Sequence, residues 1–240
     1  MANFKTHLAV ATGASGLASV TLLNLNLATP WETGSYFLLG VLGGLLPDID
    51  SDRSTPLLMI FYGLSMYCAF AMVFNIALQY SLVELFAIWV AIYFGIRYLI
   101  FEMVIRVTVH RGVFHSLLAV AFMLLLTADC FYYVLHKSAR YSWNAGVFLA
   151  LGYLVHLSLD ELFSVDLHNK RMKKSFGTAL KLFSRQNKGA SLLMAASLLL
   201  FMHYAPPAKS YWQTLQHTMQ HADWQAKLLP QQQWFKGLLN

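Results

Sequence analysis

Long stretches of the chain carry no charged side chain. Among them are the stretches from Leu8 to Trp31, from Ser54 to Val83 and from Tyr141 to Leu159. About 20 apolar residues in a helix are enough to cross a hydrocarbon core of roughly 30 Å. These stretches therefore predict membrane-spanning helices. A composition of 58% hydrophobic and only 12% charged residues excludes a water-soluble globular protein.

We expect an all-α polytopic membrane protein with about six or seven transmembrane helices, separated by clusters of Gly, Pro and polar residues. The expected spans are Leu8–Ala28, a shorter one at Ser35–Leu46, Pro56–Gln79, Leu82–Ile105, Val113–His136, Trp143–Val165 and a weak one at Gly189–Tyr204. The transmembrane domain would occupy residues 1–204. A polar C-terminal tail would follow over residues 205–240.

Basic residues concentrate in one loop, between Val165 and Gly189. They are Lys170, Arg171, Lys173, Lys174, Lys181, Arg185 and Lys188. Because loops rich in Lys and Arg stay on the cytoplasmic side, this loop predicts the orientation of the bundle. Counting helices backward places the N-terminus, the turn at Asp48–Arg53 and the turn at Arg106–Arg111 on the same side. The net charge of +6 then indicates a basic membrane face rather than a surface for nucleic acid.

Histidine and aspartate residues fall at this cytoplasmic face. His7 opens the first apolar run, and Asp48 and Asp50 lie two residues apart in a turn, where they would project to the same side. Two carboxylates that close repel each other unless a cation bridges them. His156 and Asp160 are four residues apart and share a helical face. Ionisable groups at membrane depth are costly unless they are paired, hydrated or bound to metal.

His110 and His115 are separated by five residues, which on a straight helix would point them about 140° apart. Gly112 permits a turn that brings His110 back toward His115, with Arg111 between them facing an anionic group. Simpler interpretations remain open for each cluster. They include a basic interfacial turn, helix-capping acids, and a neutral His–Asp pair that joins two helices.

Carboxylates mixed with imidazoles, without thiolates, suit zinc, manganese or iron(II). The predicted ligands are His7, Asp48, Asp50, His110, His115, His156 and Asp160. They are too many for one tetrahedral ion with an open position. We therefore expect two ions, zinc being favoured, about 3.5–4 Å apart and sharing a carboxylate and a bridging hydroxide.

With these residues assembled, the chain resembles the YdjM-like membrane-bound metal-dependent hydrolases, a group of bacterial inner-membrane proteins. The resemblance is carried by His7 and by the stretches 43–50, 110–116 and 156–160. That family is distantly similar to the zinc-dependent phospholipase C and P1 nuclease group, which implies that His7, Asp48, His156 and Asp160 are ligands. The chain departs from that group in having a single His-x-x-x-acid pair, where a three-zinc site uses two.

The resulting hypothesis is an inner-membrane hydrolase that cleaves a phosphoester of a lipid or lipid-linked substrate at the cytoplasmic face. Asp50 or Asp160 would orient the metal-activated water or take its proton. Arg111 and Arg53, with Arg97 as a further candidate, would neutralise the phosphoryl oxygens.

Two alternatives use the same residues. A metal-ion transporter would use them as a transit site, but Pro56–Gln79 and Val113–Ala128 offer almost no polar residues toward the other face. A non-catalytic structural membrane protein would use the cluster only to hold helices together.

Overall fold

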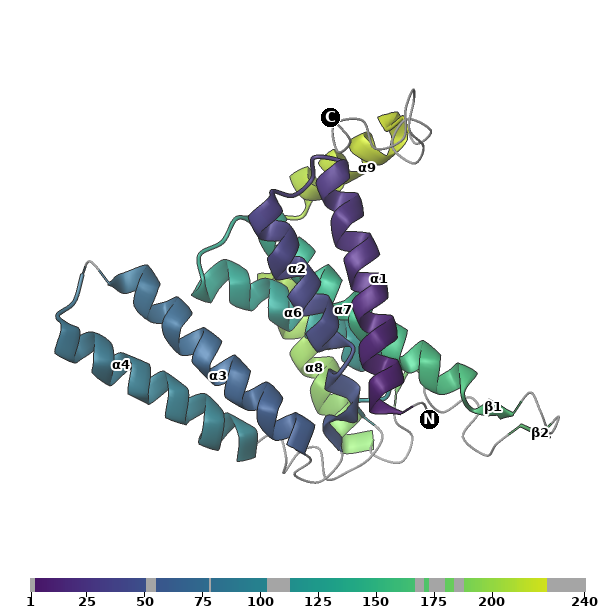
Figure 1. Cartoon of the computed structure of the whole chain (residues 1–240), viewed down its shortest axis with the longest axis horizontal. Helices are drawn as coiled ribbons and strands as arrows, with labels where there is room; N and C mark the ends of the chain where they lie inside the picture. Colours follow the sequence, from purple (N-terminus) through teal and green to yellow (C-terminus); the bar gives the residue numbers. More distant parts are fainter. Residues whose placement is uncertain are drawn as a thin grey trace, which may run out of the picture.

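The computed structural model describes residues 3–50, 55–77, 79–102, 113–166, 171–172, 180–183 and 188–223. Its helices, in chain order (Figure 1), are α1 (Phe4–Asn24), α2 (Pro30–Gly43), the 3-10 turn η1 (Leu46–Asp50), α3 (Thr55–Ile76), α4 (Leu82–Phe94) with its π-helical continuation η2 (Gly95–Ile100), α6 (Leu117–Asp129) with the π-helical continuation η3 (Cys130–Val134), α7 (Ala139–Leu162), α8 (Lys188–Tyr204) and α9 (Lys209–His221). The two-residue strands β1 (Val165–Asp166) and β2 (Arg171–Met172) pair antiparallel after α7. The predicted all-α class is confirmed.

Four helical segments of the described chain are long and apolar enough to cross a membrane. They are α1, Leu82–Ile100, Leu117–Val134 and α7. Helices α8 and α9 give a fifth if they count as one span, although the chain bends by 85° between them. Two of the expected spans are not among these within the described residues. Helix α2 has only 14 residues and so reaches about 21 Å, and of Pro56–Gln79 the segment Phe61–Phe74 is found as a shorter apolar helix.

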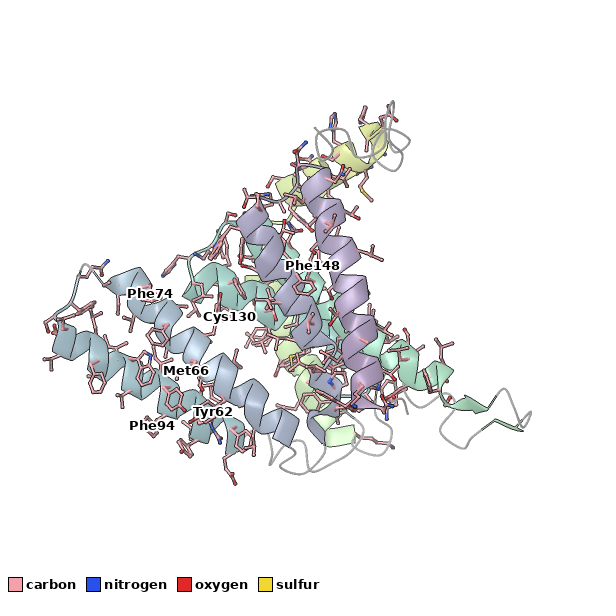
Figure 2. The ribbon with its side chains drawn as sticks, viewed as in Figure 1. Tyr62, Met66, Phe74, Phe94, Cys130 and Phe148 are labelled. Carbon is pink, nitrogen blue, oxygen red and sulfur yellow. The ribbon has the colours of Figure 1, made fainter. Side chains whose placement is uncertain are left out.

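Helix α7 is the central element of the bundle and packs against α1, α2 and α6, while α6 also packs against α8. Helices α3 and α4 pack on each other as a hairpin that extends to one side (Figure 1). Figure 2 shows large side chains along this hairpin, among them Tyr62, Phe74 and Phe94, all of which are exposed. Exposed apolar surface of this extent fits a hairpin whose surroundings are lipid.

Glycines bring α2 and α7 unusually close. Gly152 of α7 faces Gly40 and Gly44 of α2, and a Cβ atom on Gly152 would overlap the Gly40 carbonyl oxygen and lie 2.7 Å from the Gly44 nitrogen. Likewise, a Cβ atom on Gly43 would overlap the backbone carbonyl of Leu149. Small residues at a helix crossing let the two backbones touch, which is a common way to join helices within a membrane.

The end of the bundle at the start of α7 is fixed by polar contacts. The Arg140 guanidinium donates to the Leu27 carbonyl oxygen and lies 2.8 Å from the Glu32 carboxylate. Glu32 also accepts from the Thr29 backbone N–H and completes a capping box at the start of α2. These contacts tie the α1–α2 turn to α7 at the end opposite to the site described next.

Candidate metal centre

Five of the predicted ligands meet at one end of the bundle. His7 lies in the first turns of α1, Asp48 in η1, His115 just before α6, and His156 and Asp160 in the last turns of α7. The contacts between these segments show that they meet at one end of the bundle, as the sequence predicts. The side of the membrane to which this face belongs stays a prediction.

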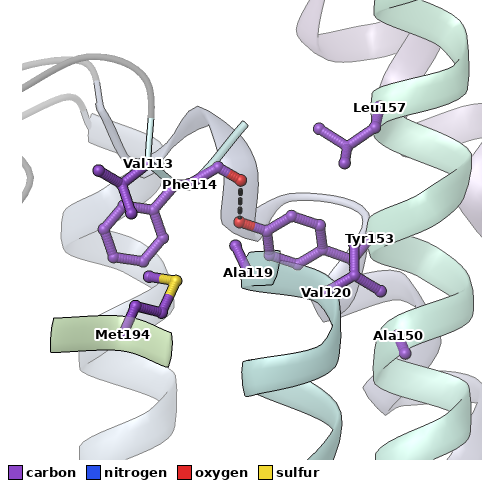
Figure 3. Close-up of a cluster of buried hydrophobic side chains, with 8 residues drawn as sticks. All are labelled: Val113, Phe114, Ala119, Val120, Ala150, Tyr153, Leu157 and Met194. Atoms are coloured by element: carbon purple, nitrogen blue, oxygen red, sulfur yellow. Dashed lines mark hydrogen bonds between the residues drawn. The ribbon is translucent and has the colours of Figure 1, made fainter. Parts of the chain in front are cut away.

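Local structure explains how His7 and His115 reach this position. The Asn3 side chain accepts from the Thr6 N–H at 2.8 Å and begins α1, whose buried residues recur every fourth position from His7. Ser116 caps α6, and this places His115 in the non-helical stretch before the helix. Tyr153 of α7 donates to the Phe114 carbonyl oxygen at 2.6 Å and fixes the backbone beside His115 (Figure 3).

Asp160 is the centre of the cluster. Its Oδ1 atom lies 3.2 Å from His7 Nε2, and its Oδ2 atom lies 3.4 Å from His115 Nε2 and 3.5 Å from His156 Nε2. Asp48 Oδ1 lies 3.4 Å from His156 Nε2. One ligand atom each from Asp48, His115, His156 and Asp160 fall within 4.8 Å of one another. These four residues could hold a metal ion.

The separations match those within a metal coordination shell. Two ligand atoms about 2.0–2.1 Å from a tetrahedral zinc ion are roughly 3.3 Å apart, and the contacts to Asp160 range from 3.2 to 3.5 Å. His156 Nε2 is buried and lies 3.4 Å from the Asp48 carboxylate and 3.5 Å from the Asp160 carboxylate. The ring nitrogen and the carboxylates are therefore close enough to bind one ion together.

A backbone contact determines which nitrogen of His156 faces that point. His156 Nδ1 lies 2.7 Å from the Gly44 carbonyl oxygen. A carbonyl oxygen only accepts, so Nδ1 carries a hydrogen, and in the neutral imidazole Nε2 then has the lone pair that binds a metal. Metal-binding histidines are commonly oriented by such a contact. The His7 ring stacks on His156, with ring centroids 3.7 Å apart and planes 11° from parallel.

The centre is closed on the helix side and open at Asp48. The side chains of His7, His156 and Asp160 are at most 2% exposed, whereas that of Asp48 is 42% exposed. Partial burial raises the pKa of Asp48, but the neighbouring His156 and His7 imidazoles together lower it by more, so the pKa lies below its ordinary value. Asp48 is therefore ionised at neutral pH, the form in which a carboxylate binds metal.

Four predicted site residues are not placed. Arg53, His110 and Arg111 lie outside the described residues, and of Asp50 only the backbone is described. Arg97 is placed, on η2 of the hairpin. Its guanidinium carbon lies 5.2 to 5.4 Å from the ring centroids of Tyr62, Tyr98 and Phe101.

Two polar groups of the structure were not predicted from the sequence. One is the Gly44 carbonyl, a backbone contact without a side-chain signal. The other is Asp129, whose carboxylate is buried in α6 without a hydrogen bond to the described residues. A carboxylate within an apolar run is a sequence signal by which Asp129 could have been identified. Asp129 lies about 18 Å along α6 from Leu117 and does not belong to the centre.

These features define an α-helical membrane protein with a buried His and Asp cluster at one end of its bundle. The sequence profile of the YdjM inner membrane protein family matches residues 1–168, and the chain belongs to this family. The match includes all five residues of the centre and ends before α8. Searches of curated proteins and of solved structures find no match.

Proposed function

We propose that the protein is a metal-dependent hydrolase that cleaves a phosphoester of a membrane lipid or lipid-linked substrate at the cytoplasmic face of the inner membrane. The observation that carries the proposal is the arrangement around Asp160, with three imidazoles 3.2 to 3.5 Å from its two oxygens at the end of a membrane bundle. A bound divalent ion would lower the pKa of a water molecule and so supply the nucleophile.

The orientation of Asp160 supports a site for two ions. Oδ1 is directed toward His7, and Oδ2 toward His115 and His156. A carboxylate that binds two ions uses its oxygens in this divided way. Asp48, His115, His156 and Asp160 would hold the first ion, and His7 would contribute to the second. Nitrogen and oxygen ligands favour zinc, with manganese and iron as alternatives.

The remaining roles extend from the sequence. Asp50, two residues beyond Asp48, or Asp160 would orient the attacking water and accept its proton. Arg53 and Arg111 would neutralise the charge that develops on the phosphoryl oxygens. The open side of the centre at Asp48 supports this arrangement, because substrate and water need one accessible edge.

The structure lends less support to the other two interpretations. If the cluster only joined helices, one imidazole paired with one carboxylate would be enough, yet Asp160 lies within 3.2 to 3.5 Å of three imidazoles. A transport route along α1 would pass Ser15. A Cβ atom on Gly40 would overlap the Ser15 hydroxyl, so this interface has no room for an ion.

A double replacement tests the proposal. We expect purified wild-type protein to contain about two equivalents of zinc, manganese or iron. The variant His156→Leu/Asp160→Leu should insert and fold but lose metal and all turnover in a screen of lipid phosphoesters. The matched control is Asn144→Leu/Tyr211→Phe, which removes another buried polar pair, joined by a 2.9 Å hydrogen bond, at the opposite end of α7.

The control should keep its metal. A His156→Leu/Asp160→Leu protein that retains wild-type metal content would refute the centre. A variant that loses metal while no lipid phosphoester is turned over by wild type would leave a metal site without the proposed reaction.

A further inference from the structure

An apolar groove lies between the start of α6, the segment 180–183 and the first half of α8. Its volume is about 520 Å³, within the range of roughly 300–1,000 Å³ typical of small-molecule sites. The walls are formed by Leu117 and Leu118 of α6, Leu182 and Phe183 of the segment, and Leu192 and Ala195 of α8. Five of these six side chains are leucine or phenylalanine, so the groove suits a hydrocarbon chain.

The groove is held in shape by backbone hydrogen bonds. The Leu117 N–H donates to the Lys181 carbonyl oxygen at 2.9 Å, and the Leu118 N–H donates to the Leu182 carbonyl oxygen at 3.1 Å. The first N–H groups of a helix have no acceptor within the helix. The segment 180–183 supplies that acceptor for α6, and this fixes one wall of the groove.

The groove begins beside the metal centre. Leu117 follows His115 by two residues. The intervening backbone is anchored by Phe114, which packs with Val113, Tyr153 and Met194 in one buried cluster (Figure 3). Met194 comes from α8, the helix that forms the opposite wall. A chain in the groove would therefore contact Leu117, two residues from His115.

A positive charge lies at one end of the apolar surface. Lys188, the first residue of α8, also lines the groove and forms no ion pair within the described part of the chain. Lysine side chains commonly extend along apolar surface toward the membrane interface. There they attract anionic lipid headgroups. The apolar walls and the single ammonium group together match a phospholipid, with a hydrocarbon chain and an anionic phosphate.

We propose that this groove binds one acyl chain of an anionic membrane phospholipid and places its phosphate at Lys188. That the bound lipid is also the substrate rests on the proposed hydrolase function. Binding itself does not depend on that function. The two statements are therefore tested separately.

The binding test uses dioleoyl phosphatidylglycerol as the probe. Protein in detergent is supplied with this lipid, washed by detergent exchange and examined by native mass spectrometry. Ala195→Trp fills the groove, and we expect it to retain at least about tenfold less lipid than wild type. Leu193→Trp is the matched control, because Leu193 is exposed on the same helix but does not line the groove. Lys188→Gln should lower the preference over dioleoyl phosphatidylcholine about fivefold.

Equal lipid retention by Ala195→Trp and wild type overturns the proposal that the groove binds the acyl chain. So does an equal loss in Leu193→Trp, because the effect would then belong to the lipid-facing surface in general.

A second measurement needs no variant. A phosphatidylglycerol with a photoreactive acyl chain should label Leu182, Phe183 and Leu192 of wild type in preference to the exposed residues Leu193, Val20 and Leu99, which lie outside the groove. Uniform labelling contradicts the proposal. Selective labelling without hydrolysis of the lipid leaves the groove in place and refutes only its role as a substrate site.

Discussion

Replacing Gly152 with alanine should disturb the metal centre from a distance, through the contact between α2 and α7. The added Cβ would overlap the Gly40 carbonyl oxygen and lie 2.7 Å from the Gly44 nitrogen. Since backbone atoms cannot rotate away, the two helices must separate by roughly 1 Å. Such overpacking destabilises a protein by about 1–3 kcal/mol. At about 2 kcal/mol, the melting temperature of a chain of this length should fall by roughly 4–8 °C.

The same movement should weaken metal binding. Gly44 accepts from His156 Nδ1 at 2.7 Å, and a shift of about 1 Å carries this contact beyond hydrogen-bonding distance. Loss of an orienting contact of this kind typically lowers metal affinity about 10–100-fold. Competition with a fluorescent zinc chelator, measured on the detergent-purified variant below its melting temperature, gives the affinity.

The control for both measurements is Gly13→Ala. Gly13 lies in α1, and no atom lies within 4 Å of a Cβ built on it. Alanine is favoured over glycine in a helix by up to about 1 kcal/mol, so this variant should melt at or slightly above the wild-type temperature and bind zinc normally. If Gly152→Ala matched Gly13→Ala in both assays, close packing of α2 on α7 would not be what orients His156.

Two further predictions concern the opposite end and the orientation of the bundle. Arg140→Ala removes the hydrogen bond to Leu27 and the ion pair with Glu32. Because the Arg140 side chain is 40% exposed, the free energy of unfolding should fall by only about 1–2 kcal/mol, and the metal content should not change. A loss of metal would contradict the assignment of this end as structural. Reporters fused after Lys174 should give a cytoplasmic signal and those fused at Arg140 a periplasmic one, because basic loops stay inside; the reverse pattern would refute the orientation.

The convergence of the ligand segments could be predicted because it follows from counting the helices along the chain. Alternating spans return the chain to the same face after every second crossing, and His7, Asp48, His115 and Asp160 all fall near ends of that parity. The four-residue spacing of His156 and Asp160 fixed their shared face before any tertiary contact was known. This count requires only that each helix returns the chain to the other face, so the short length of α2 does not change the predicted convergence.

Helix ends were predicted less well, although some signals were present. The span expected at Ser35–Leu46 starts earlier, because Thr29 and Glu32 form a capping box with Pro30 in the first turn, so α2 begins at Pro30. The span expected from Val113 begins at Leu117 because Ser116 caps it. Residues 209–221 of the expected tail form α9. The contacts of Gly152 and of the Gly44 carbonyl depend on how two helices cross, which no local pattern encodes.

The 14-residue length of α2 has a consequence for the membrane around it. Its reach of about 21 Å falls short of a hydrocarbon thickness of roughly 30 Å, whereas its neighbour α1 has 21 residues. Hydrophobic mismatch of this kind is relieved by local thinning of the bilayer or by burial of the adjoining turn below the headgroups. The adjoining turn is η1, which carries Asp48. Acyl-chain length in the host membrane thus acts on the open edge of the centre, so a thin bilayer and a thick one present Asp48 to water at different depths.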